Sequence, residues 1–389
     1  MDFIPTFVML RNPNNLRIEN WTAHGFQSLI IKRDYQTMKC KAISSFALTK
    51  LFFACGISLL SAKLVAAAVT YSVWPSTTTV VTADGSNQFG GNLSGLFYDP
   101  ATGTQQALLW AVQNSPSKLY NLVWNGSNFV KNTANSWSSG KTLRYPNGTG
   151  APDAEGVTKA ELSSTTIYIS TERDGSGSNR FSVLSYDTSS SATTLNAIKE
   201  WNLTSNLPTV SSTNLGLEAI AWVPDSYLQA NGFIDESTNL PYNSANYPLH
   251  GTGLFFVGLE ANGQIYAYAL NSDSTYRRIA TIASGNTKIM DLSFDRDNAT
   301  LWAYCDNNCS NRSTLLAIDT TVGSPTKGKF IISKGYERPS SMANINNEGI
   351  AIAPNSECAS NLKQFFWADD SETSGHAIRR GTIPCGRLF

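Results

Sequence analysis

The sequence contains no apolar segment long enough to cross a membrane. The run Leu51–Leu60 (LFFACGISLL) has ten residues, and no other segment approaches the length of about 20 residues that a membrane-spanning helix needs. We therefore expect no membrane span in the mature chain. Charged side chains are also scarce, at 15% beside 41% hydrophobic residues, so we expect a globular protein rather than a disordered one.

An excess of positive charge is missing as well. The formal net charge is zero, but the first 68 residues carry eight Lys and Arg against three Asp and Glu, which leaves 21 against 26 in the remainder. An acidic remainder argues against a nucleic-acid surface. We expect no nucleic-acid partner.

Common catalytic motifs are absent too. The sequence has no HExxH zinc motif and no G-x-S-x-G nucleophile elbow. The stretch SSGKT at 138–142 imitates the end of a phosphate-binding loop, but Asn135 stands where the first Gly should be. Only three histidines occur, and two of them, His250 and His376, follow residue 68.

The segment 38–68 has the layout of a secretory signal peptide. A basic start at Met38 (MKCK) precedes the apolar run, and Ala66 and Ala68 fit an A-x-A cleavage site. We interpret residues 1–37 as an upstream extension outside the fold and 69–389 as one domain. The expected location is extracellular, or periplasmic or at the cell surface in a bacterium, and we expect a monomer.

Four cysteines remain after the leader is removed. Behind a signal peptide they suggest two disulfides, for which we favour Cys305 with Cys309 and Cys358 with Cys385. A zinc site is the alternative, although no His lies near the CxxxC pair in sequence. The chain also has seven N-x-S/T sequons after residue 68, which predict glycosylation in a eukaryotic host: Asn92, Asn125, Asn147, Asn202, Asn298, Asn308 and Asn311.

A repeat is present in the part after the leader. Five polar residues each precede or begin an apolar run, with spacings of 61, 63, 73 and 57 residues, and we call them the lead residues: Ser94, Glu155, Glu218, Asp291 and Glu348. Each unit continues with a second apolar run that ends in polar or acidic residues, and often a third. These runs are typical of β-strands separated by turns.

Units of about 60 residues with three or four strands each predict an all-β fold, a β-propeller. Five blades are favoured, and six are the alternative if an inserted segment forms a blade. The last unit is short, so we expect the N-terminal strand-like segment YSVWPSTTTVV (71–81) to complete it and close the ring. Residues 225–252 are expected to form a loop inserted in the third unit.

The lead motifs resemble those of secreted β-propellers of the SdiA-regulated and phytase-like (esterase-like activity of phytase) type. The resemblance covers residues 88 to 385 and is carried by SGL, LEAIAW, MDLSFD, NNEGIAIAP and the C-terminal FFWADDSETSGHAIRRGTIPC. It implies a propeller fold, an extracytoplasmic location and a hydrolytic activity on ester or phosphoester bonds.

In a propeller, the first strand of each blade lines the central channel, so the five lead residues are expected to form a ring. Their oxygens would suit Ca²⁺, which takes 6 to 8 oxygen ligands. The alternative is that these acids accept hydrogen bonds from backbone N–H groups of the next blade and hold the ring together.

Candidate catalytic residues come from the acidic strand ends and the C-terminal segment. We name His376, Arg173 and Asp369, with a channel Ca²⁺ polarising an ester or phosphoester. The other second-strand ends, Asp174, Glu172, Glu260, Asp306 and Asp370, are candidates for a second cation or a substrate. A non-catalytic propeller that binds an extracellular ligand is the alternative function. Trp74, Trp124 and Trp137 are in loop-like contexts that would allow ligand stacking.

Overall fold

The computed structural model describes residues 6–12, 15–21, 30–33, 36–39, 69–103 and 106–389. The chain divides into two compact units, Met1–Ala66 and Ala67–Phe389. The first unit contains one sheet of order β2-β1-β3-β4, formed by β1 (Thr6–Asn12), β2 (Asn15–Trp21), β3 (Ile30–Arg33) and β4 (Gln36–Lys39). Most of the predicted signal peptide, residues 40–68, lies outside the described residues and stays a prediction. Among the described residues, no helix is long and apolar enough to cross a membrane.

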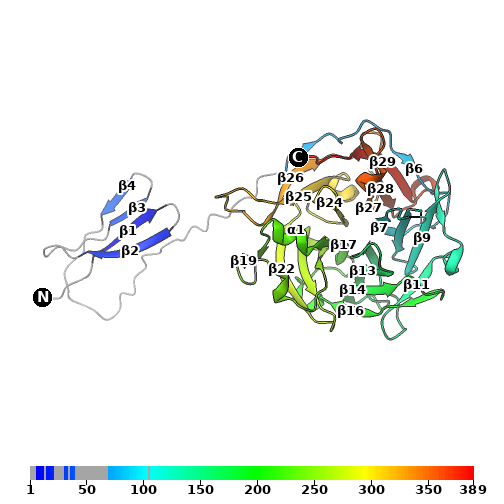
Figure 1. Ribbon diagram of the computed structural model, residues 1–389, viewed down its shortest axis with the longest axis horizontal. Coiled ribbons are helices and arrows are strands. Elements are labelled where there is room, and N and C mark those ends of the chain that lie inside the picture. The colour runs from blue at the N-terminus through cyan, green and yellow to red at the C-terminus, as the bar shows by residue number, and fades with distance from the viewer. Residues whose placement is uncertain (1–5, 13–14, 22–29, 34–35, 40–68, 104–105) are drawn as a thin grey trace. The chain divides into compact units, whose positions relative to one another are not determined.

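The second unit is a five-bladed β-propeller, as predicted (Figure 1). The first strands of neighbouring blades contact each other around the ring, so they are the innermost strands. From there the strands of a blade follow in chain order outward, except those that the N-terminal segment adds at the outer edge. The first three blades consist of β7 (Leu93–Asp99), β8 (Leu108–Gln113), β9 (Lys118–Trp124) and β11 (Lys141–Arg144); of β12 (Ala154–Thr158), β13 (Thr166–Arg173), β14 (Asn179–Asp187) and β16 (Lys199–Asn202); and of β17 (Leu217–Pro224), β20 (Gly253–Leu259), β21 (Gln264–Leu270) and β22 (Tyr276–Ala283).

The last two blades use the N-terminal segment for closure. They consist of β23 (Asp291–Asp295), β24 (Thr300–Tyr304), β25 (Ser313–Ile318) and β26 (Phe330–Tyr336), and of β27 (Asn347–Ile352), β28 (Leu362–Asp369) and β29 (Ile378–Pro384). The short strand β6 (Val81–Thr82) pairs antiparallel with β29 and supplies the fourth strand of the last blade. The segment does more than predicted, because β5 (Tyr71–Ser72) also pairs with β26 of the fourth blade.

Two smaller strands extend the first blade. β10 (Phe129–Lys131) pairs with β9, and β15 (Thr194–Asn196), which lies between β14 and β16 in sequence, pairs in parallel with β11. The second blade therefore adds a strand to the outer edge of its neighbour. Both favoured disulfides, Cys305 with Cys309 and Cys358 with Cys385, are confirmed.

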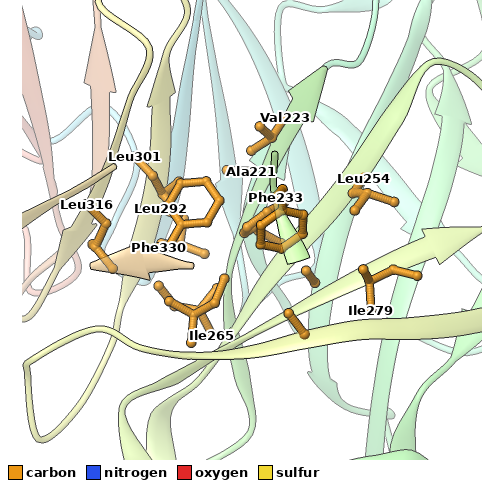
Figure 2. Close-up of a cluster of buried hydrophobic side chains, with 14 of the residues drawn as sticks. Ala221, Val223, Phe233, Leu254, Ile265, Ile279, Leu292, Leu301, Leu316 and Phe330 are labelled. Carbon is orange, nitrogen blue, oxygen red and sulfur yellow. The ribbon is translucent and has the colours of Figure 1, made fainter. Parts of the chain in front are cut away.

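The segment inserted in the third blade contributes to the core. It contains α1 (Asp225–Ala230) and the hairpin β18 (Ile234–Asp235) with β19 (Leu240–Pro241). Phe233 lies between them, is 1% exposed, and packs with its ring centroid 5.5 Å from that of Phe330 in the fourth blade (Figure 2). Full burial of such a side chain stabilises the fold by about 1.5 to 3 kcal/mol. The insertion thus fastens blade three to blade four.

Glycines beside three lead residues allow the inner strands to approach closely. A Cβ atom on Gly349 would lie 2.3 Å from the carbonyl oxygen of Ser94 in the next blade. Gly95 and Gly156 are in the same situation, with 2.5 Å to the carbonyl oxygen of Glu155 and 2.7 Å to that of Glu218. Any side chain at these positions would collide with the neighbouring backbone. In these three blades the close approach of the neighbouring inner strand therefore requires a Gly after the lead residue.

Candidate functional site

All five lead residues lie at the first or second position of an innermost strand, as the repeat predicted. In four of the five blades, the pairing of the first with the second strand shifts register at this point, and only β23 pairs without a shift. A register shift of this kind inserts an extra residue and redirects its side chain.

A cavity of about 370 Å³ lies near the axis at the level of the lead residues, and residues of all five blades line it. We call it the axial acid cavity. Its lining contains six carboxyl side chains and one ammonium group, with four asparagines: Glu155, Glu172, Glu218, Glu260, Asp306, Glu348, Lys288, Asn114, Asn214, Asn308 and Asn346. Six negative charges cannot share this volume without protons or a cation to compensate them.

The carboxyl groups approach each other closely around Glu172. One oxygen of Glu172 lies within 4.8 Å of oxygens of Glu218 and Glu260, and the same distance limit holds for Glu172 with Asp153 and Glu155. These groups come from first strands and from second-strand ends of two blades. The acidic lead residues and the acids at the second-strand ends, which the sequence presents as two groups, therefore form one site.

Burial and mutual repulsion alter the ionisation of these acids. Burial raises the pKa of Glu155, Glu218 and Glu348 well above the usual range of a glutamate, and neighbouring carboxylates add to the increase. Burial also raises the pKa of Glu172 to about 7, although the backbone N–H of Gly216 donates to its Oε1 at 2.7 Å. The cavity would therefore take up protons near neutral pH or exchange them for a cation.

The polar partners in the cavity are too few for its acids. Lys288 Nζ lies 2.5 Å from Glu260 Oε1, and Asn114 Nδ2 donates to Glu155 Oε1 at 3.4 Å. Asn346 Nδ2 donates to Glu348 Oε1 at 3.0 Å. The other oxygen of Glu155, Oε2, is buried without a hydrogen-bond partner among the described residues. A buried acceptor without a partner costs about 1 to 3 kcal/mol, and more if charged.

Asp291 and Ser94 belong to the ring but do not line the cavity. Asp291 is fully buried and accepts hydrogen bonds from the backbone N–H of Leu292 and, in the next blade, of Ile350, both at 2.7 Å. The alternative considered in the sequence, backbone bonding between blades, therefore describes Asp291. Ser94 Oγ is buried without a partner among the described residues.

The second-strand ends divide into cavity residues and structural residues. Glu172, Glu260 and Asp306 line the cavity, and the Cys305–Cys309 disulfide closes the loop that presents Asp306. Asp369 instead forms a buried ion pair with Arg379 at 2.8 Å. Asp370 accepts from Asn346, a residue of the cavity lining, at 3.2 Å, while the half-buried Asp174 accepts from backbone N–H groups of its own turn.

The structure does not bring the three candidate catalytic residues together in the cavity lining. Arg173 forms an ion pair with Asp153 and lies 3.8 Å from Glu172, at the edge of the site. His376 Nδ1 hydrogen-bonds to the buried Asp84 at 3.1 Å. The other histidine, His250, is buried in the inserted segment and bonded to Asp225 at 3.0 Å.

The sequence did not predict Lys288, the positively charged side chain of the cavity lining, or the asparagines beside it. Lys288 lies in the loop before β23 and carries no repeat signal. Asn114 could have been found, because it ends the second strand of blade one, as Glu172, Glu260 and Asp306 end or follow those of blades two to four.

Comparison with known protein families and with functionally characterised proteins found no match to this chain. The propeller fold agrees with the resemblance seen in the lead motifs, and membership of the phytase-like or SdiA-regulated proteins stays a prediction.

We expect the metal-free protein to lose stability as the pH rises. A carboxyl with a raised pKa in the folded state holds a proton that the unfolded chain releases. The contribution of this proton to the free energy of unfolding is complete below the unfolded pKa of about 4.5 and is lost as the pH rises through the folded pKa. For Glu172 this window runs from about 4.5 to about 7, worth on the order of 3 kcal/mol.

The measurement is urea unfolding in chelator across this pH range, comparing the protein with Glu172→Gln. The decline should be smaller in the variant. Equal declines in both proteins would show that Glu172 titrates normally in the folded state.

Proposed function

We propose that the axial acid cavity binds a divalent cation, and that Ca²⁺ is the ion, in a secreted phytase-like β-propeller. The observation that carries the proposal is Glu155 Oε2, a buried oxygen to which no described residue donates a hydrogen bond, in a cavity lined by six carboxyl groups. A divalent cation would supply that partner and compensate the charge that otherwise raises the pKa of these acids.

The donor set favours Ca²⁺ over zinc. All candidate ligands are carboxylate or amide oxygens, and neither a histidine nor a free thiol lines the cavity within the described residues. Calcium takes 6 to 8 oxygen ligands in flexible geometry, whereas zinc prefers nitrogen and sulfur. Glu155, Glu218 and Glu348 would hold the ion, with Glu260 and Asp306 as further donors.

Hydrolysis of an ester or phosphoester is the second candidate, favoured by one observation. Glu172, whose pKa is raised to about 7, lies in the same cavity as the proposed ion, and a general base works best with a pKa near the working pH. A bound Ca²⁺ would polarise a carbonyl or phosphoryl oxygen. His376 is not among the residues of this lining, so Glu172 is the better candidate for the base.

Isothermal titration of metal-depleted protein with Ca²⁺ tests the proposed function. We expect one site, competition by other divalent cations, and at least tenfold weaker binding in Glu218→Gln, because a ligand charge is lost. The exposed Glu236→Gln is the matched control. Binding that is absent, or unchanged in Glu218→Gln, would overturn the proposal.

A panel of p-nitrophenyl esters, phosphoesters, phytate and lactones, with and without Ca²⁺, separates the two candidates. Turnover that requires Ca²⁺ and falls in Glu172→Gln supports a hydrolase. Calcium binding without turnover on any substrate supports a non-catalytic binding propeller.

A further inference from the structure

A second cavity, of about 430 Å³, lies between the first and the last blade. Tyr98 reaches it from the end of β7 opposite to the lead residue Ser94, so this cavity is distinct from the axial acid cavity. We call it the aromatic pocket. Four aromatic rings and two ionic groups are among its lining residues: Tyr98, Trp124, Phe129, Phe366, Glu357 and Arg380. Strands β7, β9, β28 and β29, which carry most of them, lie side by side in Figure 1.

The aromatic rings are held in fixed positions. Tyr98 stacks on Phe366, with the ring planes 8° apart and the centroids at 5.5 Å, and Phe129 meets Phe366 edge-on at the same distance. Phe129 is buried, and Trp124 packs against it at 5.3 Å. The pocket therefore presents preformed aromatic surface, which is typical of ligand sites.

The guanidinium of Arg380 is the unusual feature of this pocket. It lies over the ring of Trp124 at 4.9 Å, and its Nε is buried with no hydrogen-bond partner in the described part of the chain. Among the described residues, no carboxylate lies within ion-pair distance of Arg380. The acid in the pocket, Glu357, accepts from Tyr98 Oη at 2.5 Å and from the N–H of Ala101 at 3.4 Å.

The adjacent Arg379, in contrast, has the hydrogen-bond partners expected of a structural arginine. Arg379 forms an ion pair with Asp369 at 2.8 Å and donates to the carbonyl oxygens of Thr373 and His376. Arg380, one residue later on the same strand, has a ring on one face and no acceptor from the described chain. A partly buried donor left in this way costs free energy unless a ligand supplies the acceptor.

We propose that the aromatic pocket binds a small anion with a flat apolar body, namely an aromatic carboxylate. The carboxylate would accept paired hydrogen bonds from Arg380, and the half-buried rings of Trp124 and Tyr98 would cover the body of the ligand. The cavity volume falls in the range of small-molecule sites, about 300 to 1,000 Å³. Of the three tryptophans expected to allow ligand stacking, Trp124 is the one in this pocket, since Trp74 and Trp137 are buried in packing clusters.

Isothermal titration with naphthalene-2-carboxylate tests this proposal, with quenching of tryptophan fluorescence as a second readout. The uncharged naphthalene-2-carboxamide is the matched probe. We expect the carboxylate to bind at least tenfold more tightly than the amide, and Arg380→Gln to remove that difference, because a charge-assisted hydrogen bond is lost. The exposed Arg277→Gln should keep it.

Equal binding of acid and amide to the unaltered protein, or no binding of either, would overturn the proposal without the need for any variant. Undiminished preference for the acid in a folded Arg380→Gln would also overturn it. The result does not depend on Ca²⁺ binding in the axial acid cavity, and circular dichroism with a cooperative urea transition checks that Arg380→Gln is folded.

Discussion

Replacing Asp291 with Ala is expected to lower the free energy of unfolding by about 2 to 4 kcal/mol. The fully buried carboxylate accepts from the backbone N–H groups of Leu292 and Ile350, each at 2.7 Å. Without it, two buried donors lose their acceptor, at about 1 to 3 kcal/mol each. Burial raises the pKa of this carboxyl, so its removal relieves part of the cost of burying it.

Urea unfolding of Asp291→Ala in excess chelator measures this loss. Ser94→Ala is the matched control, because Ser94 is the lead residue of the first blade and its hydroxyl has no partner in the described part of the chain. We expect the control to cost less than Asp291→Ala, because no backbone N–H group of the described residues donates to the Ser94 hydroxyl. If Asp291→Ala were equally mild, the bonds between blades four and five would not stabilise the ring.

Ca²⁺ is expected to raise the melting temperature of the protein. We expect Glu218→Gln to melt above the unaltered protein in chelator and below it in Ca²⁺. An ion that binds only the folded state stabilises it by about 2.7 kcal/mol at a hundredfold excess over its Kd. For a domain of this size that corresponds to a shift of about 5 °C. In chelator, Glu218→Gln should melt higher, because it removes a buried carboxyl whose pKa is raised by burial and by neighbouring acids.

Calorimetric scans in chelator and in Ca²⁺ measure the melting temperatures of Glu218→Gln and of the unaltered protein. Glu236→Gln should follow the unaltered protein under both conditions. A Glu218→Gln protein that melts lower than the unaltered protein in chelator, or gains as much from Ca²⁺, would contradict the role of Glu218 as a ligand.

The propeller could be predicted because its repeat appears in the residue types themselves. Five lead residues at a period of about 60 mark the inner strands, and the apolar runs behind them mark the second strands. The short last unit required a strand from elsewhere, which β6 supplies. The addition of β5 to the fourth blade left no signal, because a two-residue strand has no periodicity to detect.

The candidate site could be predicted only in part. Periodicity places Asp291 and Glu218 at equivalent positions, but it does not show which carboxylate meets a backbone N–H group and which one faces the cavity. The register shift is present at Glu218 and absent at Asp291, and the residue types do not reveal where it occurs. Lys288 lies in a loop outside the repeat, and the sequence alone does not distinguish Arg380 from the adjacent Arg379, so only their three-dimensional neighbours reveal their importance.

The most direct test of the account is to locate the cation. Crystals grown with Ca²⁺, and measured at a wavelength where Ca²⁺ scatters anomalously, should show one peak in the axial acid cavity. We expect it within about 2.3 to 2.6 Å of carboxylate oxygens of Glu155 and Glu218. A cavity without an anomalous peak under these conditions, with Glu155 Oε2 bonded to water or to Lys288 instead, would contradict the central claim.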